Sequence, residues 1–222
     1  MAKQLVITAA IILSLATLAV GADATPPTPI AFPGLTVTPV DTAQVEKAIE
    51  DVKTADAQLL GIEVKVNADL DVIAGVLKRC GYTLPAVTSA AGTPTYANEI
   101  AARNTAVVNY CADPAAIGKV KTDLTKADRD ALSNAKLDLL GLQAQLPTVL
   151  TAVTTALVTL QNAVLGLPAL MSAAGSGGNA EQLSKLSADI AEILPKAFTL
   201  PTRVNAITDT VAKVIAFTSL VL

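Results

Sequence analysis

Two cysteines, Cys80 and Cys111, offer the most definite chemistry in this chain of 222 residues. An even number of cysteines in an exported protein favours a disulfide bond, and the N-terminal residues described below predict export. The bond would close a loop of roughly 30 residues and stabilise the fold by about 3–4 kcal/mol on the chain-entropy account. A pair of buried free thiols is the alternative.

Catalytic residues are hard to find in the rest of the chain. It contains no histidine, which excludes Ser-His-Asp and Cys-His nucleophile systems and histidine-ligated metals or haem. The run from Gly175 to Gly178 has no strand before it and no lysine after it, so it predicts a turn and not a phosphate cradle. The chain has the Asp and Glu residues that a glycoside hydrolase would need as its carboxylate pair. Sugar-binding clefts are usually rich in aromatic side chains, however, and this chain has only three Tyr, three Phe and no Trp. We therefore expect no enzyme activity and no metal or cofactor.

Apolar residues of one long uncharged stretch form a different candidate site. From Leu139 to Ala180 the chain has no Asp, Glu, Lys or Arg, and three apolar series with a seven-residue period run through it. Such a stripe is wider than a two-stranded coiled coil needs, so it can leave an apolar channel between helices. An ordinary filled core is the alternative reading. The candidate lining residues are Leu150, Val153, Leu157, Leu160 and Val164.

The N-terminal residues divide into two segments ahead of the main domain. Residues 1–22 combine Lys3 with an apolar run and small residues near Ala22, which predicts a secretory signal peptide; an uncleaved anchor is the alternative. Residues 23–37 are rich in Pro and Thr and predict an extended segment. Residues 38–222 remain for a single helical domain.

Heptad-like apolar spacing predicts that this domain is an all-α, up-and-down bundle of four or five helices. The helices are expected over about 38–80, 94–111, 114–146, 147–174 and 180–221. Val45, Val52 and Leu59 begin one coiled-coil-like series that runs to Cys80. Strand signals are weak, because the chain has neither Asn-Gly nor Asp-Gly hairpins.

Capping residues and prolines set the expected helix ends. Thr38-Pro39 and Thr93-Pro94 have the N-cap and N1 pattern, and Asp113-Pro114 opens the next helix. Gly81 is expected just past the end of the first helix. A capping box at Thr125–Asp128 can break the third helix, and Asn179 with Gln182 can cap the last one. Pro147 is expected to kink or start a helix, and Pro195 and Pro201 to kink or divide the last one.

For some charged residues the sequence does not decide between a polar site and a solvent-exposed position. Asp56 and Glu63 occupy an otherwise apolar series; they could form an internal polar site, but we expect Ala55 and Ile62 to take their places and both acids to point outward. The charged run at Lys126–Asp130 is expected to be a solvated face.

Charge and hydropathy restrict the partners. The net charge is −3, the isoelectric point is near 4.9 and the mean hydropathy is +0.52. Nucleic acids and anionic membrane surfaces need a basic face, which this chain lacks. An apolar small molecule, a hydrophobic surface or a membrane core are partners of the right chemistry, and the oligomeric state stays open.

These observations predict a secreted, periplasmic or cell-surface helical bundle that binds an apolar ligand (a lipid, fatty acid or sterol) or a hydrophobic surface. In composition the chain resembles secreted helical proteins of fungal cell walls that bind hydrophobic surfaces or lipids. One alternative is a membrane-active, pore-forming type of protein, because the segment from Pro147 to Ala174 is long enough to span a bilayer. Another is a structural or adhesive protein of the cell envelope.

Overall fold

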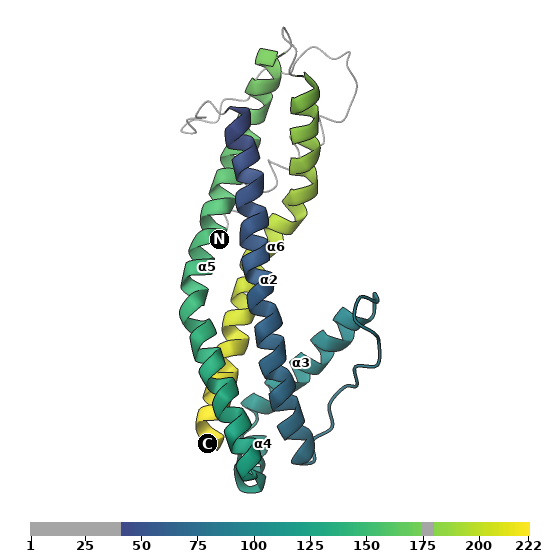
Figure 1. Cartoon of the computed structure of the whole chain (residues 1–222), viewed down its shortest axis with the longest axis vertical. Coiled ribbons are helices and arrows are strands. Elements are labelled where there is room, and N and C mark those ends of the chain that lie inside the picture. Colours follow the sequence, from purple (N-terminus) through teal and green to yellow (C-terminus); the bar gives the residue numbers. More distant parts are fainter. Residues whose placement is uncertain (1–40, 175–179) are drawn as a thin grey trace. The chain divides into compact units, whose positions relative to one another are not determined.

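The protein is an all-α bundle, as the apolar spacing predicts. The computed structural model describes residues 41–174 and 180–222, and within them it contains five helices and no strand (Figure 1). The predicted signal peptide (1–22), the Pro/Thr-rich segment (23–37) and the helix start at Thr38 lie outside the described residues. The helices are α2 (Thr42–Arg79), α3 (Tyr96–Ala112), α4 (Pro114–Asp123), α5 (Lys126–Ala174) and α6 (Ala180–Val221).

Two compact units share the three long helices. Unit 1 contains the described residues 41–52, 155–174 and 180–195, which are one end of α2, of α5 and of α6. Unit 2 contains residues 53–154 and 196–222, which are the rest of these helices together with α3 and α4.

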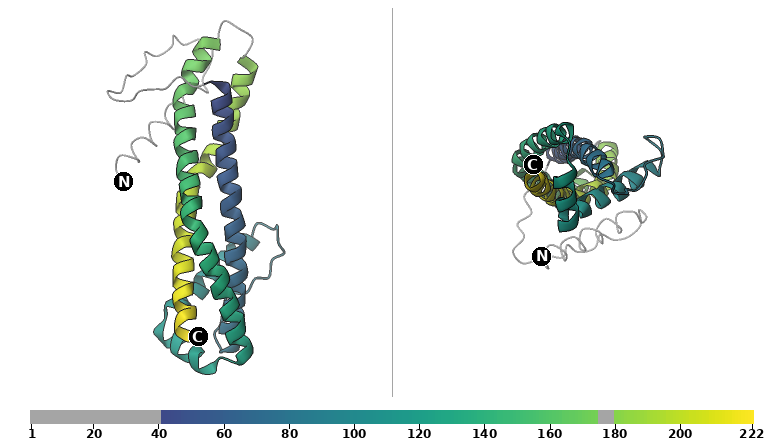
Figure 2. Two further views of the ribbon diagram at one scale, coloured as in Figure 1. Left: turned by 60° about the vertical axis from the view of Figure 1, so that its left-hand side comes forward. Right: turned by 90° about the horizontal axis from the view of Figure 1, so that it is seen from below.

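Unit 2 is built from antiparallel long helices with two short helices at one end. Its α2 and α6 segments run in one direction and its α5 segment runs in the other, while α3 and α4 connect α2 to α5 (Figures 1 and 2). The most deeply buried large side chains of this unit come from all three long helices: Leu59, Leu70, Ile73, Leu77, Leu132, Leu139, Leu200 and Phe217.

Unit 1 has a smaller core made by three helix segments. Val45, Ile49 and Val52 of α2 are buried there, together with apolar side chains of α5 and α6. The buried positions of α5 in this unit alternate between small and large residues, which lets neighbouring helices approach closely. The α5 and α6 contributions are Ala156, Leu160, Ala163, Val164, Leu167, Leu183, Leu186, Ile190 and Ile193.

Within the described residues, helix α2 begins and ends at local signals. The backbone N–H of Gln44 donates to the Asp41 carboxylate at 2.8 Å, and the Asp41 N–H donates to the Gln44 side chain at 2.9 Å. This reciprocal pair is a capping box, so the described helix begins at Thr42. At the other end Gly81 has a φ of +87°, and Tyr82 N–H donates to the Leu77 carbonyl, as in a Schellman motif.

Helix α4 follows its capping residues closely, whereas the N-cap residue of α3 is Thr95, which makes no side-chain capping hydrogen bond, and not the predicted Thr93. Asp113 caps α4, because its side chain accepts the Ala115 N–H at 3.0 Å and Pro114 occupies the first helical position. Helix α3 begins at Tyr96, two residues after the predicted start, and ends at Ala112. Helix α4 ends at Asp123, which separates it from α5 at the predicted capping box.

Helix α5 corrects the prediction of separate helices over 114–146 and 147–174. It is one helix from Lys126 to Ala174, and Pro147 lies within it. Proline removes one backbone hydrogen bond and frees the carbonyl four residues earlier, but Gln143, which carries that carbonyl, is exposed, as is Pro147 itself. Because Leu146 and Val149 on either side are buried, packing keeps the helix continuous. Helix α6 is likewise undivided at Pro195 and Pro201.

The apolar stripe of α5 is narrower than predicted. The series through Leu139 and Val153 and the series through Leu142 and Ala156 are buried throughout, which gives the alternating three- and four-residue spacing of a coiled-coil seam. The third predicted series lies at the edge of this seam, because only Val164 of its members is buried. Its members are Leu150, Leu157, Val164 and Met171.

Candidate functional site

The five residues predicted to line an apolar channel do not share one environment. Val153 and Leu160 lie in the α5 seam and are 1% and 2% exposed, and Val164 is also buried. Leu157 is half-buried, whereas Leu150 is 43% exposed and faces solvent. The structure therefore does not bring them together around one channel: three belong to the filled core and Leu150 belongs to the surface.

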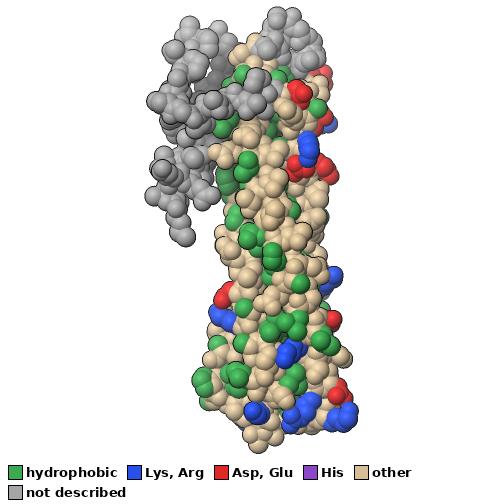
Figure 3. All heavy atoms as spheres, turned by 90° about the vertical axis from the view of Figure 1, so that its left-hand side faces the viewer, with side chains coloured by type: hydrophobic (Ala, Val, Ile, Leu, Met, Phe, Trp, Pro, Cys, Tyr) green, Lys and Arg blue, Asp and Glu red, His purple; other side chains and the backbone are tan. Residues whose placement is uncertain are grey.

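The surface side of α5 is the more unusual feature. In unit 2 the exposed residues of this helix from Leu140 to Thr154 carry no charge, and we call them the α5 neutral face. In the view of the side on which α5 lies, uncharged side chains and backbone make up most of the surface that is not drawn in grey (Figure 3). The α5 neutral face consists of Leu140, Gly141, Gln143, Ala144, Gln145, Pro147, Thr148, Leu150, Thr151 and Thr154.

Two of the three threonine hydroxyls on this face donate to carbonyls of their own helix. The Thr151 hydroxyl donates to the Pro147 carbonyl at 2.9 Å, and the Thr154 hydroxyl donates to the Leu150 carbonyl at 2.8 Å. The Gln145 amide donates to the Gly141 carbonyl at 3.2 Å. These groups have a partner within the helix, so the threonine methyl groups are the parts left without a polar contact. The face can therefore lose water at a lower cost than its composition implies.

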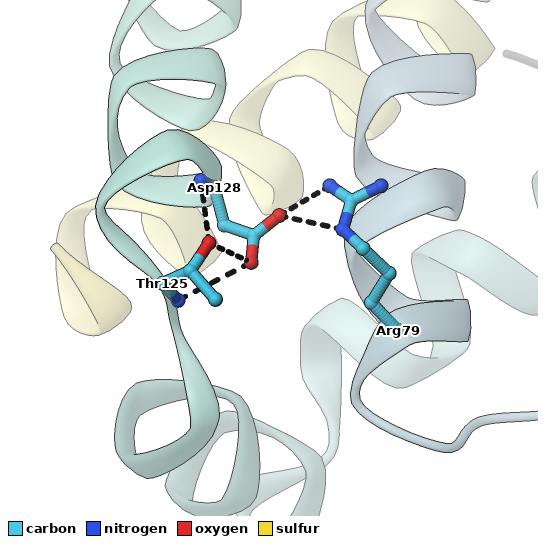
Figure 4. Close-up of polar contacts among 3 residues, drawn as sticks. All are labelled: Arg79, Thr125 and Asp128. Atoms are coloured by element: carbon cyan, nitrogen blue, oxygen red, sulfur yellow. Dashed lines mark hydrogen bonds and ion pairs between the residues drawn. The ribbon is translucent and has the colours of Figure 1, made fainter.

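An arginine links α2 to the start of α5. Arg79 donates to the Asp128 carboxylate, and the second Asp128 oxygen accepts the Thr125 hydroxyl at 2.6 Å and the Thr125 N–H at 3.2 Å (Figure 4). The Asp128 N–H donates back to the Thr125 hydroxyl, which confirms the predicted capping box. The hydrogen bond from the Thr125 hydroxyl, together with Arg79, lowers the pKa of Asp128. Asp128 is only 3% exposed, so the prediction that the whole charged run is solvated is wrong at this residue.

A second arginine links α6 to α2. Arg203 donates to both oxygens of Glu63 at 2.8 Å and to Asp56 at 2.5 Å, and all three side chains are about two-thirds to three-quarters buried. Hydrogen bonds to Glu63 and Asp56 raise the pKa of Arg203 against the effect of desolvation. Ala55 and Ile62 are buried as predicted, but the two acids form an interhelical ion pair and do not simply point into solvent.

A third arginine links α3 to α2. Arg103 forms an ion pair with Asp71, and it also donates to the side chain of Asn104 at 2.9 Å. Asn104 in turn donates to Asn67 of α2 at 2.6 Å. Arg79, Arg103 and Arg203 therefore each join α2 to a different helix of unit 2. None of these pairings could be read from the apolar periodicity, because the partners are far apart in the sequence.

A buried carboxylate in the seam of α2 was also missed. Asp69 is 7% exposed and continues the seven-residue series of Ala55 and Ile62, so that series was the signal that could have found it. Burial, and secondarily the negative charge of Asp138 on α5, raise the pKa of Asp69 to about 6. The charge of Asp138 therefore destabilises the ionised form of Asp69. Within the described residues, no group of three or more His, Cys, Asp or Glu is placed to hold a metal ion.

The two cysteines are free thiols in the structure, so the predicted disulfide is not formed. Both Cys80 and Cys111 are buried. Burial raises the pKa of Cys111 to about 12, and burial is also the largest cause that raises the pKa of Cys80. A thiol must lose its proton to react, so both cysteines are poor nucleophiles at neutral pH. They contribute to the core as small apolar residues.

Comparison of the chain with protein-family models, with curated protein sequences and with solved structures finds no match. Within the described residues, the parts of α5 over Lys126–Ser172 and of α6 over Glu181–Val221 are long and apolar enough to cross a membrane, by length and composition only. Core helices of soluble proteins pass the same test.

Proposed function

We propose that this protein is a non-enzymatic helical bundle that binds a hydrophobic surface through the α5 neutral face. The observation that carries the proposal is a solvent-exposed helix face without charge, on which Leu140 and Leu150 are exposed and the hydroxyls of Thr151 and Thr154 are already satisfied. The exposed apolar area on this face favours a surface over a small enclosed ligand as the partner. A signal peptide in residues 1–22 would place the protein outside the cytoplasm, where such surfaces are met.

Adsorption to octyl-coated silica particles, with uncoated silica as the reference, tests this function. The variant Thr148→Lys/Thr151→Lys places two charges one turn apart on the α5 neutral face. We expect it to lower the affinity for octyl particles at least tenfold, because each ammonium group must lose water on contact. The matched control is Asn205→Lys/Thr208→Lys on α6, where both residues are exposed and Thr208 donates to the Val204 carbonyl at 2.8 Å, as Thr151 does to Pro147. Equal adsorption of the two variants would contradict the proposal.

Membrane activity is the second candidate function, favoured by the length and composition of α5 and α6. A pore-forming protein would release a trapped dye from phosphatidylcholine vesicles. A protein that only adsorbs would bind octyl particles and leave the vesicles intact. Dye release that rises with protein concentration would therefore replace the first proposal with this one.

A further inference from the structure

Arginine is distributed unevenly between the two units. All four arginines of the chain lie in unit 2, and three of them join α2 to α3, α5 or α6 as described above. Unit 1 has no arginine. There, α2 and α6 are joined by a neutral-to-charged contact, the exposed hydrogen bond from the Gln182 amide to the Glu46 carboxylate at 3.3 Å. Among the interhelical contacts named above, this hydrogen bond of unit 1 is weaker than the arginine–carboxylate pairs of unit 2.

The sizes of the two cores also indicate that unit 1 opens more easily than unit 2. The described part of unit 1 consists of three short helix segments, and a small core supplies only a few kcal/mol of net stability. Unit 2 contains the larger apolar core and the helices α3 and α4 in addition. An external apolar surface can replace the buried contacts of a unit that opens. Opening unit 1 needs less free energy than opening unit 2.

The segment of α5 in unit 1 carries no charged residue. Its inner side is apolar, with Leu160 and Leu167 buried, and its exposed residues are uncharged. The hydroxyls of Thr159 and Ser172 donate to carbonyls of their own helix at 2.9 Å. The α2 and α6 segments of unit 1 are amphipathic, because their exposed positions include Glu46, Lys47, Glu181 and Lys185. Amphipathic helices of this kind lie flat on an apolar surface.

We infer that unit 1 opens on an alkyl surface and lays its buried seam on it, while the arginine-linked unit 2 stays closed. The inference rests on the proposed function and goes beyond it: the α5 neutral face makes the first contact, and the seam residues of unit 1 supply further contact area. The occupant is a hydrocarbon surface, because the seam consists of Leu, Ile, Val and Ala and offers no partner for a charged headgroup.

Distance measurement between spin labels tests the opening. The variant Glu46→Cys/Gln182→Cys labels two helices of unit 1 at side chains that are in contact. The matched pair Ala57→Cys/Thr202→Cys labels the same two helices in unit 2, at exposed positions beside the Arg203 ion pairs. Cys80 and Cys111 stay in place, since they are buried, and the number of labels attached is checked by mass. On octyl-coated silica we expect the 46–182 distance to increase by about 10 Å or more, roughly one helix diameter, and the 57–202 distance to stay unchanged.

Cross-linking the same positions tests whether opening strengthens adsorption. A short bis-maleimide between the thiols introduced at positions 46 and 182 should lower the affinity of that variant for octyl particles at least tenfold, relative to the same variant blocked with a mono-maleimide at both sites. An unchanged 46–182 distance on the particles, or equal affinity of the cross-linked and blocked proteins, would overturn the inference. The proposed function fails separately, if the unmodified protein does not adsorb or if Thr148→Lys/Thr151→Lys adsorbs normally.

Discussion

Unit 1 and unit 2 are built from the same three long helices, yet different forces hold them. In unit 2 arginine side chains join α2 to each of its neighbours across a large Leu-, Val- and Ile-rich core. In unit 1 the helix ends share a smaller core with several alanines and a hydrogen bond between exposed side chains. We infer from this difference that α2, α5 and α6 are held more firmly over their unit 2 segments than over their unit 1 segments.

The largest difference is expected from core truncations. Leu200→Ala removes a fully buried side chain of unit 2 and should lower the free energy of unfolding by about 2–5 kcal/mol, because a cavity remains. Leu186→Ala makes the same change in unit 1. We expect it to destabilise only the first, smaller step in urea unfolding followed by circular dichroism. One shared transition that both variants shift equally would show that the units do not unfold separately.

A smaller effect is expected from the buried acid of unit 2. The pKa of Asp69 is about 6 in the fold against 3.8 without it, so the folded protein binds more protons between these values. Stability from this group therefore falls as pH rises through that window, and the loss is complete above it, at roughly 3 kcal/mol for two pKa units. Asp69→Asn should be more stable than the parent by about 3 kcal/mol at pH 8 and by little at pH 4.

Urea unfolding at both pH values measures this effect. Asp138→Asn is the companion variant, because it removes the neighbouring charge and leaves the burial of Asp69 unchanged. It should stabilise at pH 8 in the same direction but less, since burial is the larger cause of the shift. A parent protein whose stability does not change between pH 5 and pH 8 relative to Asp69→Asn would contradict the assigned pKa.

Loss of one interhelical ion pair should cost less again. Arg203→Met leaves Asp56 and Glu63 without their partner in a partly buried place, and we expect a loss of about 1–2 kcal/mol that shrinks in high salt. Arg129→Met is the control, because Arg129 is an exposed arginine of the same unit. Equal stability of the two variants would show that the Arg203 contact does not help to keep unit 2 closed.

The smallest effect is expected when unit 1 is given a contact of the unit 2 type. Gln182→Arg would turn the hydrogen bond to Glu46 into an ion pair and stabilise unit 1 by about 0.2–1 kcal/mol, the usual range for exposed pairs. The variant should adsorb to octyl particles slightly less than the parent. Stronger adsorption would indicate that charge at this site, and not closure of unit 1, governs binding.

Much of the fold could be predicted because its causes are local. The buried positions of α6, such as Leu183, Leu186 and Ile190, follow a period that is visible in the sequence. The left-handed φ of Gly81 and the caps at Asp113 and Thr125 also depend only on nearby residues. Pro147 misled the prediction because local propensity disfavours a helix there, whereas packing on both sides of it decides the outcome.

The polar contacts could not be predicted, because their partners are distant in sequence. Arg79 and Asp128 are 49 residues apart, and Arg203 and Glu63 are 140 apart. Apolar periodicity states which face of each helix is buried but not which neighbour it meets. The same limit explains the candidate lining residues: Leu150 and Val153 are both apolar, but only the packing of α5 shows that one is exposed and the other is in the core.

Hydrogen exchange in increasing urea, followed by mass spectrometry, tests the central claim most directly. Helix α5 passes through both units, so it carries its own comparison. We expect amides within residues 155–172 to lose protection at a lower urea concentration than those within 126–154, and the segments 41–52 and 181–195 to follow the first group. Loss of protection over the whole of α5 at a single urea concentration would contradict a unit 1 that opens while unit 2 stays closed.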